Sequence, residues 1–253
     1  MFKDDRKGRA LGIHGSGGNI GMCIIPLVSG VLADYFGWRT VFGLFPVFAL
    51  AIALLFSATL RDRKVRSEKL RLRPILSRRL LIISFSLGFI SMAARGTSVF
   101  FPMKLSSMEY SSSYVGLLFA LLFGSGIFGQ YAGGYFSDKH SKKAMIAYLS
   151  LASSALLFVS FFIQDLFALA VLMLVAGFVK DAIWPPFFSL STDNVSRKSY
   201  GTTLGVFFSI GFIMSSQAPV IMGVVWDHFS FLASVSLLLI FGVAATLAVR
   251  QVQ

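Results

Sequence analysis

The chain has 253 residues, of which 56% are hydrophobic and only 13% charged, and its mean hydropathy is +0.77. A soluble domain of this length needs far more charge to cover its surface, so the composition excludes that class and indicates an integral membrane protein. The formal net charge of +12 does not indicate a nucleic-acid-binding domain, because the basic residues lie between long apolar runs and form no stripe with aromatic residues.

The apolar runs are long enough to cross a bilayer as helices, since a span needs about 20 mostly apolar residues. Their hydrophobicity is continuous and does not alternate, which favours helices over the strands of a membrane barrel. The sequence therefore predicts an all-α integral membrane bundle of about eight transmembrane helices. In chain order these are expected near residues 11–33, 38–60, 80–104, 113–136, 143–163, 166–188, 202–225 and 231–250.

The 23 Lys and Arg residues are divided unevenly between the two sides of such a bundle. Most precede the first span, follow the eighth, or lie in the connections after the second, fourth and sixth spans. Arg39 and Lys104 lie on the opposite side. Because connections rich in Lys and Arg stay in the cytoplasm, we expect a multi-pass protein of the plasma or inner membrane with both termini cytoplasmic.

The longest connection, residues 61–79, carries a dense run of Lys and Arg. Such a run is too charged for a core and is expected to lie near anionic lipid headgroups as a basic cytoplasmic linker. It divides the chain into residues 1–60, which hold two spans, and residues 80–253, which hold six.

The first span resembles the seventh when the sequence is aligned with itself without gaps. The matched residues are mostly Gly and Pro, which determine helix packing and kinks, so coincidence is a poor explanation. We therefore expect a repeat of six helices in parallel orientation, an architecture known in transporters. Counterparts of residues 80–200 would precede Met1, so the chain is expected to be truncated from twelve helices. The matched pairs include Gly12 and Gly205, Pro26 and Pro219, Gly30 and Gly223, and Asp34 and Asp227.

The connection after the fourth span contains Gly134-Tyr-Phe-Ser-Asp138-Lys-His-Ser-Lys142-Lys143. It resembles the cytoplasmic loop signature of major facilitator transporters, Gly-x-x-x-Asp-x-x-Gly-Arg-Lys/Arg, with Ser and Lys replacing the usual Gly and Arg. The Asp138 carboxylate can accept from backbone N–H groups and join helix ends in one state of a transport cycle. An ordinary capped basic turn is the alternative.

Two patterns in the first two spans also resemble that family. Gly21-Met-Cys-Ile-Ile-Pro26-Leu-Val-Ser-Gly30 is similar to its antiporter-type signature, although two of the signature's glycines are replaced. Gly21 and Gly30 would allow close helix approach, with Pro26 as a kink and Pro219 and Gly223 as their counterparts. The run from Asp34 to Arg39 is similar to the short outer turn between the family's fifth and sixth helices. The chain would then hold the last two helices of the first half and all of the second.

Charged residues inside a span are costly and are functional candidates. Arg95 lies in the third span on a small-polar stripe that begins at Ser84 and Gly88, a face expected to line a wet cavity. An arginine that reaches outward to the headgroups is the alternative.

The sixth span carries Lys180 and Asp181, followed by Trp184 and a double proline that should break the helix. Lys180 shares a helix face with Trp184, whereas Asp181 points about 100° away, so the two charges need not pair with each other. One could bind substrate while the other pairs with a different helix, and a purely structural charge pair is the alternative.

Gln130 on the fourth span and Gln217 on the seventh can form hydrogen bonds to a substrate or between helices. His14, His140 and His228 have no paired ligands, and the one cysteine, Cys23, allows no thiolate cluster, so no metal or cofactor is expected.

Together these patterns predict a secondary active transporter of a small solute that works by alternating access, and no enzyme. Arg95 and Lys180 point to an anionic substrate such as an organic acid, with an exported drug or metabolite still open. Coupling to a proton or another ion is open as well, because Asp181 could bind a cation. The alternative is a truncated, non-transporting fragment or assembly partner. The expected partners are the small-molecule substrate and the lipid bilayer.

Overall fold

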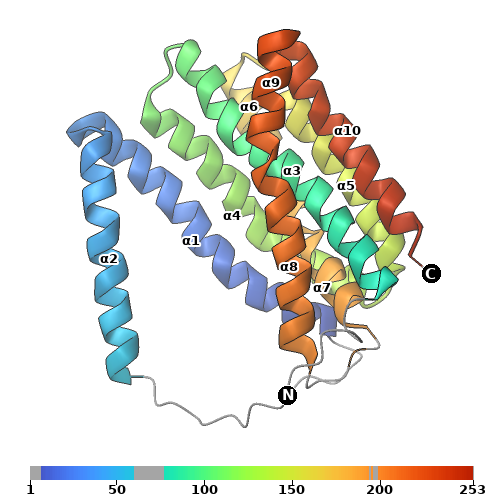
Figure 1. Cartoon of the computed structure of the whole chain (residues 1–253). Helices are drawn as coiled ribbons and strands as arrows, with labels where there is room; N and C mark the ends of the chain where they lie inside the picture. The colour runs from blue at the N-terminus through green and yellow to red at the C-terminus, as the bar shows by residue number, and fades with distance from the viewer. Residues whose placement is uncertain (1–6, 60–76, 194, 196–198, 253) are drawn as a thin grey trace.

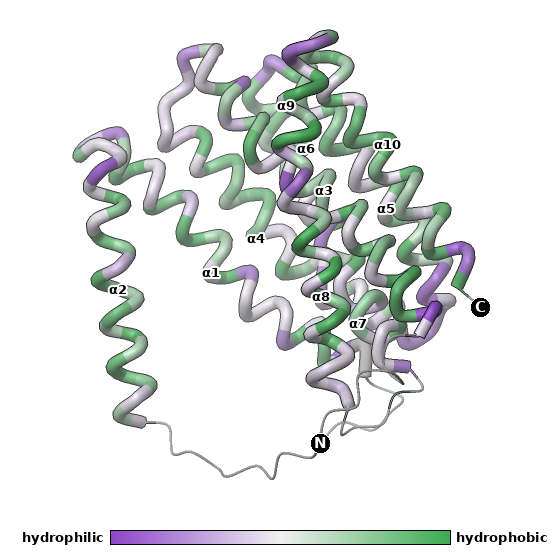
Figure 2. The backbone as a smooth tube through the Cα atoms, viewed as in Figure 1, coloured by the Kyte–Doolittle hydropathy of each residue, from purple (hydrophilic) through white to green (hydrophobic). Residues whose placement is uncertain are grey.

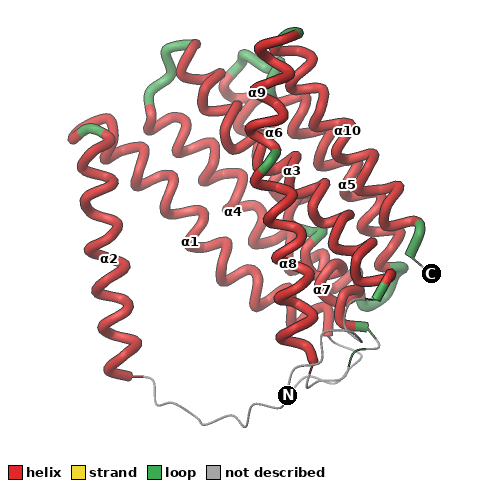
Figure 3. Tube along the Cα trace, viewed as in Figure 1, coloured by secondary structure: helices red, strands yellow, loops and turns green. Residues whose placement is uncertain are grey.

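The computed structural model describes residues 7–59, 77–193, 195 and 199–252. These residues form helices joined by short turns, with no strand among them (Figure 3). In chain order the helices are α1 (Lys7–Phe36), α2 (Trp38–Thr59), α3 (Arg78–Ser107), α4 (Ser112–Ser137), α5 (Lys142–Ser160), α6 (Leu166–Asp181), α7 (Trp184–Thr192), α8 (Tyr200–Ser216), α9 (Ala218–His228) and α10 (Phe231–Arg250).

Eight stretches of the described chain are long and apolar enough to cross a membrane, which confirms the predicted all-α membrane bundle. Two of these spans each contain a pair of helices: α6 with α7 over Leu166–Thr192, and α8 with α9 over Tyr200–His228. Hydrophilic residues gather mainly at the helix ends and turns, whereas α2 is largely hydrophobic (Figure 2).

The interruptions of these two spans coincide with prolines. α6 ends at Asp181 and α7 begins at Trp184, immediately before the predicted break at Pro185 and Pro186. α8 ends at Ser216 and α9 begins just before Pro219. Proline lacks an N–H and its ring crowds the preceding turn, so a helix restarts there more easily than it continues.

The six helical spans from α3 onward form the packed part of the molecule, and α1 lies along α4 at its edge (Figure 1). α3 has the highest buried share of any span and contributes Leu87 and Phe101 to the core, which Phe187 of α7 also joins. α2 packs mainly against α1 and has no buried residue among those described. The predicted division into residues 1–60 and 80–253 agrees with this arrangement but remains a prediction, and most of the 61–79 linker lies outside the described residues.

Candidate functional site

A buried ion pair lies at the end of α6. Lys180 Nζ is 2.5 Å from Asp181 Oδ1, and the two side chains are 13% and 2% exposed. α6 brings them about 20 Å into the bundle from Leu166, at 1.5 Å per residue. The sequence left this pairing open because adjacent helical residues point apart, but at the end of the helix the long lysine side chain bends back to its neighbour. Both charges are thus neutralised deep within a span.

Asp181 is also held from a different part of the chain. Asn19 Nδ2 on α1 donates to Asp181 Oδ2 at 2.8 Å, and Asn19 is itself only 4% exposed. The contact requires Gly126 on α4, because a Cβ built there would overlap Asp181 Oδ2 and lie 2.6 Å from Asn19 Nδ2. Three helices therefore meet at this carboxylate.

One aromatic ring lies against the lysine of the pair, and an aromatic group begins at the next helix. Lys180 Nζ lies 5.0 Å from the centroid of the Phe123 ring on α4, within the range of a cation–π interaction. Trp184, one turn further on, stacks at 5.9 Å on Phe188 and lies 6.4 Å from Phe208 of α8. With its side chain only 13% exposed, the lysine has little contact with solvent.

Gln130 lies one turn along α4 from Gly126 and is 5% exposed. Its Oε1 is buried and has no hydrogen-bond partner in the described chain. The amide fits against α1 only because residue 15 is Gly, where any Cβ would overlap Oε1. An unpaired buried acceptor is costly, so Gln130 is suited to accept a hydrogen bond from a bound solute or water.

Backbone contacts hold α1 closely along α4. Ser16 Oγ donates to Ile127 O at 2.9 Å, and Cys23 Sγ to Ala120 O at 3.3 Å. Gly30 lies against the Ser112 carbonyl, and the Pro26 carbonyl lies against Gly116 of α4. Gly21, Gly223 and the counterpart glycine Gly205 instead face open space, so the packing role predicted for Gly21, Pro219 and Gly223 stays a prediction.

The antiparallel helices α1 and α4 each cap the N-terminus of the other. Asp34 near the end of α1 accepts from the backbone N–H groups of Ser112 and Ser113, at 2.9 and 2.7 Å, at the start of α4. At the opposite end, Asp138 Oδ2 at the C-cap of α4 accepts from Arg9 N in the first turn of α1, at 3.1 Å. Carboxylates at helix N-termini satisfy otherwise unpaired N–H groups and favour the helix dipole.

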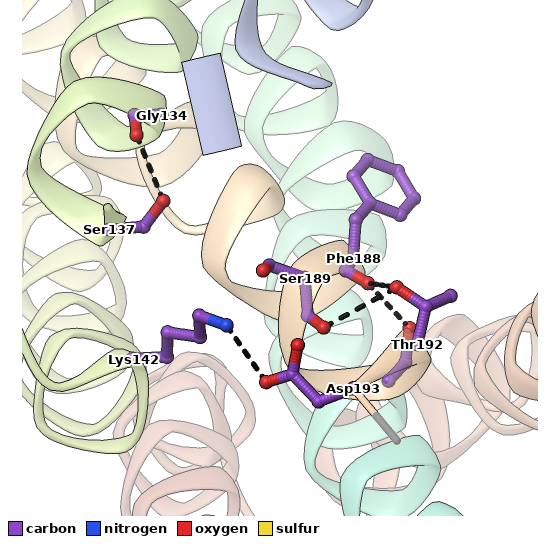
Figure 4. A network of polar contacts seen from close by, with 8 residues as sticks. Gly134, Ser137, Lys142, Phe188, Ser189, Thr192 and Asp193 are labelled. Atoms are coloured by element: carbon purple, nitrogen blue, oxygen red, sulfur yellow. Dashed lines mark hydrogen bonds and ion pairs between the residues drawn. The ribbon is translucent and has the colours of Figure 1, made fainter. Parts of the chain in front are cut away.

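The turn that carries the predicted loop signature joins several helix ends (Figure 4). Ser137 Oγ donates to Gly134 O at 2.9 Å, and Lys142 Nζ forms an ion pair of 2.8 Å with Asp193, just after α7. Lys143 Nζ donates to the carbonyl of Val252. The predicted acceptance of a backbone N–H by Asp138 is present, and Lys142 pairs with an acid that the motif alone did not indicate.

Two other predicted candidates lie apart from this buried cluster. Arg95 is exposed on α3, and the stripe predicted with it divides: Ser84 is fully buried and Gly88 packs against Met214 of α8. The expectation that this whole face is wet is therefore wrong for Ser84, which is fully buried, and for Gly88, which α8 covers. Gln217 is exposed at the α8–α9 break, where Nε2 donates to Ser216 Oγ at 3.2 Å.

Sequence reasoning missed Asn19 and Asp193. Asn19 stands in the Gly-rich start of the first span, and an amide in an apolar span was itself a signal for a polar contact. Asp193 follows the seventh helix of the chain, and no spacing rule links it to Lys142.

Comparison with known proteins supplies the family. The model of the Major Facilitator Superfamily matches residues 1–219, most of the chain. The chain belongs to this superfamily. A curated relative, the inner membrane transport protein YnfM of Escherichia coli strain K12, is 32% identical over 120 residues, which cover 43% of this chain and 29% of that protein. The superfamily is the one that the loop and first-span signatures resembled.

Proposed function

We propose that the protein is a secondary active transporter that moves a small anionic solute by alternating access. The observation that carries the proposal is the contact of Asn19 with the Lys180–Asp181 pair. It joins α1, which the sequence assigns to the first six-helix half, to α6 of the second. On that division the polar site would lie between the two halves that rock against each other. Transporters of this repeat type bind substrate near the midplane at such an interface.

Lys180 is the residue proposed to bind the anion. Its ammonium lies deep in a span beside the Phe123 ring, where a low dielectric strengthens an ion pair. Gln130, with its unpaired Oε1, and Trp184 would contact the remainder of the solute. Asp138 and Lys142 are proposed to help hold the helix ends together in one state of the cycle.

Uptake into proteoliposomes tests the proposal, with a panel of radiolabelled solutes that includes lactate, benzoate and citrate. We expect saturable uptake of at least one anion, reduced at least tenfold by Lys180→Gln. Lys139→Gln is the matched control, since Lys139 lies in the turn after α4, is exposed, and contacts Tyr135 in the last turn of that helix. Unchanged uptake of every anion by Lys180→Gln would refute the role of Lys180.

A second candidate is an assembly partner that needs another helix to complete it. Gly12 and Gly30 of α1 are covered by α4, whereas their repeat counterparts Gly205 and Gly223 face open space. The uncovered face would fit a helix placed as α4 is against α1. Failure of the purified chain to bind or transport any solute of the panel would favour this candidate.

A further inference from the structure

The three-residue cluster of Lys180, Asp181 and Asn19 is electrically neutral, and both carboxylate oxygens of Asp181 have a partner. Asp181 Oδ1 contacts Lys180 Nζ at 2.5 Å, and Oδ2 accepts from Asn19 Nδ2 at 2.8 Å. Asp181 has a side chain 2% exposed, so water cannot replace either partner without a rearrangement. An anion that binds the Lys180 ammonium in place of Asp181 therefore leaves the Asp181 carboxylate without its counter-charge, unless that carboxylate is neutralised at the same time.

A net charge at this depth in a membrane is costly, which limits how an anion can bind. If an anion pairs with the Lys180 ammonium, the displaced Asp181 carboxylate adds a second negative charge to the site. A proton on Asp181 restores the former balance, because the site plus a monovalent anion is then neutral again. In this exchange the Lys180–Asp181 ion pair breaks, an O–H bond forms on Asp181, and an ion pair forms between Lys180 and the anion.

Asn19 suits both protonation states of Asp181. Its carboxamide holds a donor and an acceptor, so Nδ2–H can donate to the carboxylate, as in this structure, and Oδ1 can accept from the carboxylic acid after the amide turns over. Gly126 leaves the space beside both groups free of a side chain. Asn19 would thus keep α1 in contact with α6 through the exchange without itself carrying the proton.

Among the titratable groups of the described residues, the one that contacts Asp181 is Lys180. The helices α1, α4, α5 and α7 surround this end of α6, and their other titratable groups lie at the bundle surface or have other partners. They are Arg9, His14, Cys23 and Asp34 on α1, Tyr114, Tyr131, Tyr135 and the C-cap Asp138 of α4, Lys142, Lys143 and Tyr148 on α5, and Asp193 after α7.

We propose that Asp181 takes up one proton for each monovalent organic anion that Lys180 binds, which makes transport an electroneutral proton–anion symport. This inference rests on the proposed function for its substrate class, but the proton-binding step can be measured without any substrate.

The transport measurement uses proteoliposomes, the anion found in the solute panel, and an imposed pH gradient. At equilibrium, one-to-one electroneutral symport accumulates the anion about tenfold per pH unit. A potassium diffusion potential with valinomycin should leave that ratio unchanged. Accumulation that follows the potential, or that ignores the pH gradient, would overturn the proposed stoichiometry.

Three variants test whether Asp181 is the residue that carries the transported proton. Asp181→Asn should still exchange labelled for unlabelled anion but lose pH-driven accumulation, so that its ratio falls to one. Asp227→Asn, the same change at an exposed residue at the end of α9, should keep the wild-type ratio. Asn19→Leu should slow uptake yet leave the ratio at equilibrium unaltered, because a positioning residue changes rate and not stoichiometry.

Infrared spectroscopy tests proton binding independently of transport. Lys180→Gln removes the cation, so at pH 7 the carbonyl stretch of a protonated carboxylic acid should appear that is absent from the wild type and from Lys180→Gln/Asp181→Asn. Lack of that band in Lys180→Gln would overturn the inference. If no anion is transported, the proposed function fails, whereas this band still decides whether Asp181 accepts the proton.

Discussion

A methyl group added at Gly126 should disrupt the buried cluster, whereas the same group added at Gly21 should not. Both glycines are helical, and they differ in what a Cβ would contact. At Gly126 it would overlap Asp181 Oδ2 and come within 2.6 Å of Asn19 Nδ2, whereas at Gly21 nothing lies within 4 Å. The pair of substitutions therefore separates the contact from the general effect of replacing glycine by alanine.

The expected cost of Gly126→Ala comes from two sources. Loss of a hydrogen bond to a charged group costs about 1.5–3 kcal/mol, and overpacking a tight site costs about 1–3 kcal/mol. These two costs are not independent, because a movement of Asp181 that relieves the overpacking also breaks its hydrogen bond to Asn19. We therefore expect the free energy of unfolding to fall by about 2–5 kcal/mol. Gly21→Ala should change stability by less than about 1 kcal/mol, in the stabilising direction, because alanine favours the helix.

The free energy of unfolding can be measured for both variants by titrating SDS into mixed micelles and following helicity by circular dichroism. Equal midpoints for Gly126→Ala and Gly21→Ala would refute the argument that Gly126 makes room for the Asn19–Asp181 contact. A midpoint lowered in both would point instead to a general sensitivity of these helices to substitution.

Three further outcomes are expected. Asp34→Ala should weaken the contact between α1 and α4, because two N–H groups in the first turn of α4 lose their acceptor. The expected result is a lower melting temperature in detergent for Asp34→Ala, with no such change for the controls Asp34→Asn and Asp34→Glu, which keep an acceptor. A double-mutant cycle of Lys142→Gln and Asp193→Asn should give a coupling of about 0.2–1 kcal/mol, because the pair is about one-quarter exposed; a coupling near zero in low salt would contradict the ion pair. Cys23 should react with maleimide more slowly in folded protein than after SDS unfolding, since its Sγ donates to a carbonyl of α4. Equal rates would contradict this contact between α1 and α4.

The sequence alone determined the membrane class, the eight spans and the family resemblance. Run length and continuity of apolar residues decide whether a segment crosses a bilayer, and both are local properties of the chain. The break at Pro185 and Pro186 was equally predictable, because proline lacks an N–H wherever it stands. The family model supports the resemblance read from the Gly134–Lys143 loop and the first span.

Only the tertiary structure decided which polar groups meet. Lys180 and Asp181 could be picked out because charges in apolar runs are conspicuous, but Asn19, 162 residues from Asp181, is brought to them by the packing of α1 on α4. That packing depends on the space left at Gly126 and Gly15, which no spacing within one helix specifies. Helical periodicity tells which residues share a face, whereas the rotation and depth at which two faces meet follow from the fit of all side chains between them.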